Sequence, residues 1–141
     1  MNLQRCRNFI LFALTLLISN ITTGQEQDCT LGIGGKDTSL IVQVFQLNQE
    51  QQLKLEEWSG EYQLMQKDHR DRVKKLFDTH PQETPSELLK MSEKFALLKE
   101  ELVTASKAID QKLLGIFNER QYMRYIELCE EVARRPMQRT D

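Results

Sequence analysis

The chain has 141 residues, of which 40% are hydrophobic and 28% charged, and its formal net charge is −2. This length is enough for one domain, and the slightly acidic balance argues against nucleic acid as the main partner. The sequence contains no Gly-rich phosphate loop, no His-Glu-x-x-His motif and no nucleophile motif, so we expect neither an enzyme nor a cofactor-binding protein.

Residues 1–24 have the pattern of a secretory signal peptide. Arg5 and Arg7 give a basic start, 9–18 form an apolar run, and small residues at 22–24 suit cleavage. The alternative is an uncleaved membrane anchor, but the run is shorter than the roughly 20 apolar residues that span a bilayer. We therefore expect an exported protein with no stable membrane insertion after cleavage and a mature net charge of about −4.

The cysteines indicate one disulfide. Cleavage of the leader would remove Cys6 and leave Cys29 and Cys129. Two cysteines in an exported protein suggest that they are bonded to each other. The bond would tie the N-terminal segment to the last helix. A redox role is less favoured because the sequence has no C-x-x-C motif.

The mature chain begins with a segment that lacks hydrophobic periodicity. Residues 25–38 contain Gly32, Gly34 and Gly35, and we predict a flexible N-terminal arm there. Residues 39–46 are apolar enough for one short helix. A strand is the alternative for 39–46, but the brevity of this segment and its helical surroundings favour a helix.

A pentad with one chemical pattern occurs at 47–51 and again at 117–121. Each copy has an apolar residue, then Asn, two variable residues and Gln. An Asn side chain accepts from the first-turn N–H groups of a helix, and Gln three residues later reaches back to the cap's own N–H. Each pentad therefore predicts a helix start. Its structural motif residues are Leu47, Asn48, Gln51, Phe117, Asn118 and Gln121.

Two long helices follow the first pentad. One runs from Gln49 to about Asp78, and the second begins at Thr84–Pro85, where a Thr cap, Pro and Glu87 form a strong start signal. Apolar residues recur at three- and four-residue steps on one face of each. The first stripe is Leu55, Trp58, Tyr62, Met65, His69, Arg72 or Val73, and Leu76; the second is Leu88, Met91, Phe95, Leu98, Leu102, Ala105, Ile109, Leu113 and Ile116.

Because only a short turn joins them, the two long helices are predicted to pack as an elongated antiparallel hairpin. A last helix is expected from Glu119 to about Arg134, with Tyr122, Tyr125 or Ile126, and Cys129 facing inward. Pro136 is expected to stop it. The helical domain would then span 39–135, followed by a disordered tail at 136–141.

The two pentads, their wide separation, the leader and the hairpin between them resemble the LTxxQ family of periplasmic proteins, which includes the chaperone Spy and the stress regulator CpxP. The resemblance covers about residues 40–135. It implies an all-α fold with short N-terminal and C-terminal helices, and a cradle-shaped homodimer. The chain departs from the family motif because Asn48 and Asn118 replace Thr and Phe117 replaces Leu. Asn and Thr are both good caps.

The resemblance implies a periplasmic, ATP-independent chaperone that binds unfolding proteins during envelope stress. The alternative is a periplasmic regulator that binds the sensor domain of a membrane kinase or another envelope-stress signalling component. A purely structural envelope protein is a third possibility. A metal sensor is disfavoured because the only histidines, His69 and His80, do not form a ligand cluster with other residues.

Apolar residues off the two stripes and a basic run in the first long helix are candidates for a client-binding or dimer surface. Apolar side chains that have no packing partner within a hairpin often mark an interface. For the basic run, a solvated helix face with i,i+4 ion pairs is the alternative. The candidate surface comprises Leu53, Leu64, Arg70, Arg72, Lys74, Lys75, Phe77 and Leu97.

Overall fold

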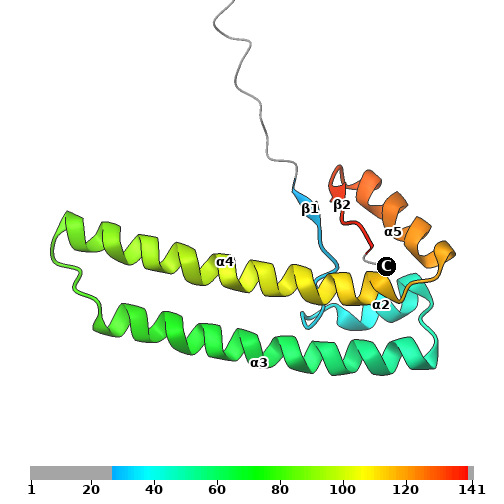
Figure 1. Ribbon diagram of the computed structural model, residues 1–141, viewed down its shortest axis with the longest axis horizontal. Helices are drawn as coiled ribbons and strands as arrows, with labels where there is room; N and C mark the ends of the chain where they lie inside the picture. The colour runs from blue at the N-terminus through cyan, green and yellow to red at the C-terminus, as the bar shows by residue number, and fades with distance from the viewer. Residues whose placement is uncertain (1–26, 140–141) are drawn as a thin grey trace, which may run out of the picture.

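The computed structural model describes residues 27–139, so the predicted signal peptide (1–24) and the last residues of the predicted tail (140–141) lie outside the described residues. The described part is mostly helical (Figure 1). Helices α3 (Gln49–Thr79) and α4 (Pro85–Gly115) form the predicted antiparallel hairpin, and shorter helices α2 (Thr38–Phe45) and α5 (Glu119–Glu131) flank it. At about 1.5 Å per residue, α3 is roughly 46 Å long.

The expectation of an all-α fold is corrected by two short strands. β1 (Asp28–Cys29) and β2 (Arg135–Pro136) pair in parallel, with Asp28 opposite Arg135 and Cys29 opposite Pro136. The strands lie beside the end of the hairpin where α3 begins and α4 ends (Figure 1). We call this end the base and the α3–α4 turn the tip.

Both capping boxes that the pentads predict are present. In the first, Gln51 N–H donates to Asn48 Oδ1 at 2.9 Å, and Asn48 N–H donates to Gln51 Oε1 at 3.1 Å. In the second, Asn118 and Gln121 make the same reciprocal pair at 2.9 Å each. These bonds satisfy backbone donors that a helix start otherwise leaves without an intrahelical partner.

Replacing Asn118 with Ala should lower the free energy of unfolding by about 1 kcal/mol, because the N–H of Gln121 loses its acceptor. Chemical denaturation followed by circular dichroism measures this change. Asn118→Asp is the matched control, since a carboxylate accepts the same bond and suits a helix N-terminus. Equal stability of the Ala variant and the unaltered protein would contradict the capping role.

The hydrophobic core lies entirely at the base. Its members come from the N-terminal segment and from every helix, and no residue between 63 and 108 is buried. The hairpin therefore projects from the base as an arm of two helices with no third layer. The buried apolar residues are Cys29, Ile33, Ile41, Phe45, Leu47, Leu55, Tyr62, Ile109, Leu113, Leu114, Phe117, Tyr125, Cys129 and Met137.

The flexible arm predicted for 25–38 is corrected for the residues that the structure describes. Ile33 is only 1% exposed, and the N–H groups of Leu31 and Ile33 donate to the Asp110 carboxylate at 2.7 and 3.3 Å. Gly34 has φ +79°, and a Cβ there would lie 2.9 Å from the Tyr62 ring. Here glycine provides a left-handed turn and a close approach rather than mobility. We call residues 27–34 the strap.

The C-terminal segment also differs from the sequence prediction. α5 ends at Glu131, because Ala133 adopts a left-handed conformation with φ 51° and Arg134 N–H closes the turn on the Cys129 carbonyl at 2.9 Å. Pro136 therefore belongs to β2 and does not stop the helix. Met137 is 7% exposed, so residues 136–137 of the predicted disordered tail are packed against the base.

Candidate functional site

The structure joins the two pentads at the base through the side chains of Gln51 and Gln121. The Nε2 of each donates to the Oε1 of the other, at 2.8 and 2.9 Å. Gln51 Nε2 also donates to the Ile116 carbonyl at 2.8 Å, and Gln121 Nε2 donates to the Phe45 carbonyl at 3.0 Å. Both amides are therefore fully bonded although each residue is only 6% exposed.

The remaining motif residues surround this glutamine pair. Leu47 and Phe117 are 5% and 4% exposed, and the Phe117 ring lies 4.8 Å from the Phe45 ring. The capping pattern predicts each helix start separately and contains no signal that the two Gln side chains bond to each other. All six motif residues thus meet at one joint, which fixes where α3 begins relative to α5.

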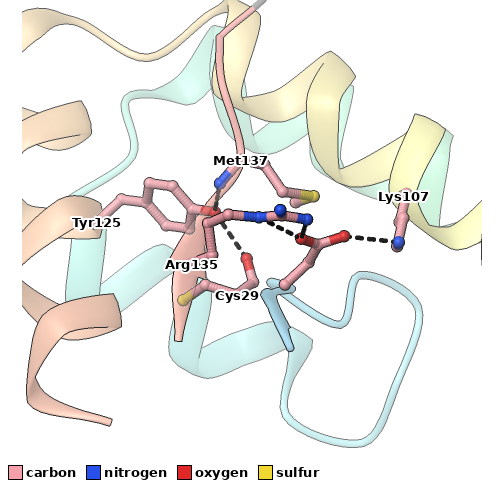
Figure 2. Close-up of polar contacts among 6 residues, drawn as sticks. Cys29, Lys107, Tyr125, Arg135 and Met137 are labelled. Atoms are coloured by element: carbon pink, nitrogen blue, oxygen red, sulfur yellow. Dashed lines mark hydrogen bonds and ion pairs between the residues drawn. The ribbon is translucent and has the colours of Figure 1, made fainter. Parts of the chain in front are cut away.

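The predicted disulfide between Cys29 and Cys129 is present and joins β1 to α5. Figure 2 shows the Tyr125 hydroxyl between β1 and β2: it donates to the Cys29 carbonyl at 2.6 Å and accepts from the Met137 N–H at 2.8 Å. Because Tyr125 is 1% exposed, these bonds form in a water-excluded site. The sequence identified Tyr125 as an inward residue but gave no sign of this bridge.

Charged residues on the rim of the base hold the strap from two sides. The Asp28 carboxylate pairs with Lys107 of α4 at 2.6 Å and also pairs with Arg135 of β2 (Figure 2). The hydrogen bonds from Lys107 and Arg135 lower the pKa of Asp28 below its ordinary value. Inside the base, burial raises the pKa of Asp110, and the backbone N–H bonds from the strap oppose that rise.

The arm exposes apolar side chains along its whole length. Phe77 and Phe95 meet edge to face with ring centroids 6.0 Å apart, yet they are 44% and 37% exposed. A hollow of about 350 Å³ opens between the strap and the arm, lined in part by Tyr62, Leu102 and Val103. The exposed apolar residues of the arm are Leu64, Phe77, Leu88, Leu89, Phe95, Leu97 and Val103.

The residues predicted as one client or dimer surface lie on different sides of the hairpin. Leu53 and Leu64 are 62% and 72% exposed on the side of α3 away from its buried residues, whereas Leu97 is 61% exposed on α4. Part of the basic run is engaged in ion pairs: Arg72 contacts Glu101 at 2.6 Å, and Lys74 pairs with Asp78. Arg70, Lys75 and Phe77 are also exposed.

The arm has a second hollow, of about 370 Å³, lined by residues that include Met65, His69 and Leu102. His69 is half-buried there, as its place on the apolar stripe indicates. Among residues 27–139, no group of three His, Cys, Asp or Glu residues is arranged to hold a metal ion. Within the same residues, none of the helices is both long and apolar enough to cross a membrane.

Comparison of the chain with protein-family models, with curated protein sequences and with solved structures finds no match. The resemblance to the LTxxQ family therefore rests on the two pentads, the leader and the hairpin alone. Because a fold alone does not define a function, the function of this protein is inferred from the site itself.

Proposed function

We propose that this protein is an ATP-independent chaperone of the periplasm, which holds unfolding proteins on the exposed apolar side chains of its hairpin arm. One observation carries the proposal. From residue 63 to residue 108 no side chain is buried, and seven large apolar residues in this stretch are exposed. Two helices without a third layer leave such residues open to a partner.

The distribution of these residues suits a client of variable sequence. Val103 lines the hollow beside the strap, and helical spacing places Ala96 and Leu89 on the same side of α4, seven and fourteen residues before it. Charged residues alternate with them along the arm, for example Lys90, Glu93 and Lys94. Alternating charges keep an apolar surface soluble. Contacts spread along such a surface would be individually weak and would not require one client sequence.

The disulfide supports the proposed periplasmic location. Stable disulfides form in oxidising compartments such as the periplasm, and the Cys29–Cys129 bond is part of the base that carries the arm. Together with the predicted leader, this favours an exported protein. Because the net charge of the protein is acidic, we propose that the apolar residues of the arm, and not basic residues, bind the client.

The test is suppression of aggregation of a chemically denatured client, followed by light scattering without nucleotide. The unaltered protein should suppress aggregation near a one-to-one ratio of chaperone to client. Leu89→Ser combined with Leu97→Ser should weaken suppression several-fold, because both side chains are more than 60% exposed on the arm. Val132→Ser is the matched control, since Val132 is 60% exposed but lies at the base after α5.

Absence of suppression at several-fold excess would overturn the chaperone proposal. The regulatory alternative predicts a different result, namely saturable binding of a single periplasmic sensor domain in a pull-down from membranes. Equal loss of activity in the arm variant and in the Val132 control would also contradict the assignment, because the effect would then not depend on the arm.

A further inference from the structure

Strand β1 has a free edge among the residues that the structure describes. The sheet consists of two strands, and β2 pairs with one side of β1 only. The other side of β1 is turned toward the tip of the hairpin (Figure 1). An unpaired strand edge is a template on which a further strand can pair. The free edge of β1 is therefore a place where an extended chain can bind.

The backbone groups of Asp28 point to this free edge. The Gln27 carbonyl accepts from the Arg135 N–H of β2 at 3.1 Å. The Cys29 carbonyl accepts from the Tyr125 hydroxyl, which lies between the two strands. Successive residues of a strand direct their backbone groups to opposite sides, so the Asp28 N–H and C=O point away from β2. Within the part of the chain that the structure describes, neither group has a hydrogen-bond partner.

An apolar hollow lies beside the same edge. It has a volume of about 350 Å³ and is lined from the strap by Asp28 and from the arm by Tyr62, Leu102 and Val103. The Asp28 carboxylate contacts Lys107 of α4 at 2.6 Å, so the face of β1 that carries this side chain is turned toward α4. Residues paired across two strands direct their side chains to the same face. A residue bonded to Asp28 would therefore place its side chain in the hollow.

We propose that an extended segment of an unfolding client binds as a third strand beside β1, with one apolar side chain in this hollow. The identity of the occupant rests on the chaperone activity proposed above. The Asp28 N–H and C=O bond the backbone of the segment, and the hollow takes its apolar side chain. The neighbouring side chains of the segment point away from α4 and can be polar. The site thus selects segments in which apolar and polar residues alternate.

An unfolding chain matches the chemistry that this edge offers. Lys107 and Arg135 both pair with the Asp28 carboxylate, so these charges hold β1 in place. The groups of the edge that lack partners are the uncharged N–H and C=O of the main chain. Folded proteins have already paired most of their own backbone groups, whereas an unfolding segment has them available.

The edge is also continuous with the proposed client surface of the arm. Val103 is 44% exposed, lines the hollow and belongs to the row that continues through Ala96 to Leu89 on α4. A client segment bound to β1 therefore lies next to the exposed apolar side chains that are proposed to hold the rest of the client. The β1 edge adds a contact that depends on backbone conformation to contacts that depend on apolar side chains.

Fluorescence anisotropy of a labelled peptide of alternating valine and threonine tests the proposal on the exported, disulfide-bonded protein. Because the residue bonded to Asp28 places its side chain in the apolar hollow, the valines should be the residues that bond to the edge. N-methylation of the valine amides should weaken binding at least about tenfold, because a methyl group replaces the bonding N–H. N-methylation of the threonine amides is the matched control, since these groups lie on the far edge of the bound peptide and binding should be retained.

A variant of the hollow tests the same site from the protein side. Val103→Asn should weaken binding of the unmodified peptide several-fold, because it replaces an apolar contact of the hollow with a polar amide. Met123→Asn is the matched control: Met123 is 52% exposed on α5 and does not line the hollow, so this variant should bind normally. Circular dichroism checks that both variants fold.

Hydrogen exchange followed by NMR locates the bound peptide. The Asp28 amide should exchange readily in the free protein and become protected when the peptide binds. An Asp28 amide that stays unprotected, equal weakening by both N-methylated peptides, or binding indifferent to Val103→Asn would overturn the proposal. Protection that rises with protein concentration without peptide would assign the edge to a second copy and would also overturn it.

The outcome for the β1 edge can be separated from the outcome for the chaperone activity. Suppression of aggregation without peptide binding at the edge would overturn this proposal and leave the chaperone activity supported. Peptide binding at the edge without suppression of aggregation would support the strand site and overturn the chaperone activity alone.

Discussion

Replacing Gln121 with Met should lower the free energy of unfolding by about 3 kcal/mol. The two side chains are similar in size, but Met donates and accepts no comparable bond. The change removes the acceptor of the Asn118 N–H, the donor to the Phe45 carbonyl and both contacts with Gln51. Each buried polar group that loses its partner costs about 1–3 kcal/mol. Urea denaturation measures the loss.

A double-mutant cycle separates the glutamine pair from the individual caps. Gln51→Met should be destabilising by a similar amount, because the network is nearly symmetric. In the double variant, two Met side chains contact each other and no glutamine side-chain amide is left without its partner, while the backbone N–H groups of Asn48 and Asn118 lose their acceptors as in the single variants. We expect its loss to be smaller than the sum of the single losses by at least about 1 kcal/mol, as for residues in direct contact.

Gln63→Met is the control for this cycle. Gln63 is exposed on α3, and a surface substitution of this kind changes stability by no more than about 0.5 kcal/mol. Additive losses for Gln51 and Gln121 would show that the two pentads act as separate helix caps. The joint between α3 and α5 would then depend on apolar packing around Leu47 and Phe117.

The sequence predicted the hairpin because its signals are local. The caps Asn48, Thr84 and Asn118 each act within one turn of their own helix, and the observed helices begin directly after them. The apolar stripes identify the inward faces in the same way. The exposure of Leu64 and Leu97 could also be anticipated, because both residues lie off the stripes.

The contacts that the sequence did not reveal join residues distant along the chain. The strap contains three glycines and no periodic pattern, and its order comes from Asp110, whose carboxylate lies on the buried face of α4. Asp110 lies one residue after Ile109 and off the predicted apolar stripe, so the sequence contained no signal that this carboxylate is buried and needs buried donors. The β1–β2 pair could not be predicted from the sequence because each strand has only two residues. The Tyr125 bridge could not be predicted either, because it depends on a single hydroxyl group.

Removing the Cys29–Cys129 disulfide should have the largest effect, a loss of about 4 kcal/mol in the free energy of unfolding. The bond joins residues separated by 100 positions. In the chain-entropy model, closing a loop of that size strongly restricts the unfolded ensemble. The variant to measure is Cys29→Ala with Cys129→Ala, because Ala buries no unpaired thiol or hydroxyl at these positions, which are 8% and 0% exposed.

Hydrogen exchange of the same double variant should show where the native structure loosens. The strap amides of Leu31 and Ile33 depend on β1 staying in place, whereas the arm helices bond within themselves. Protection of the backbone amides against exchange should therefore fall more in 28–33 than in 63–108, after the fall in global stability has been taken into account. Reduction of the unaltered protein should reproduce the pattern. Unchanged stability would contradict the expected effect, and a uniform loss of protection would show that the Tyr125 and Asp110 bonds hold the strap without the disulfide.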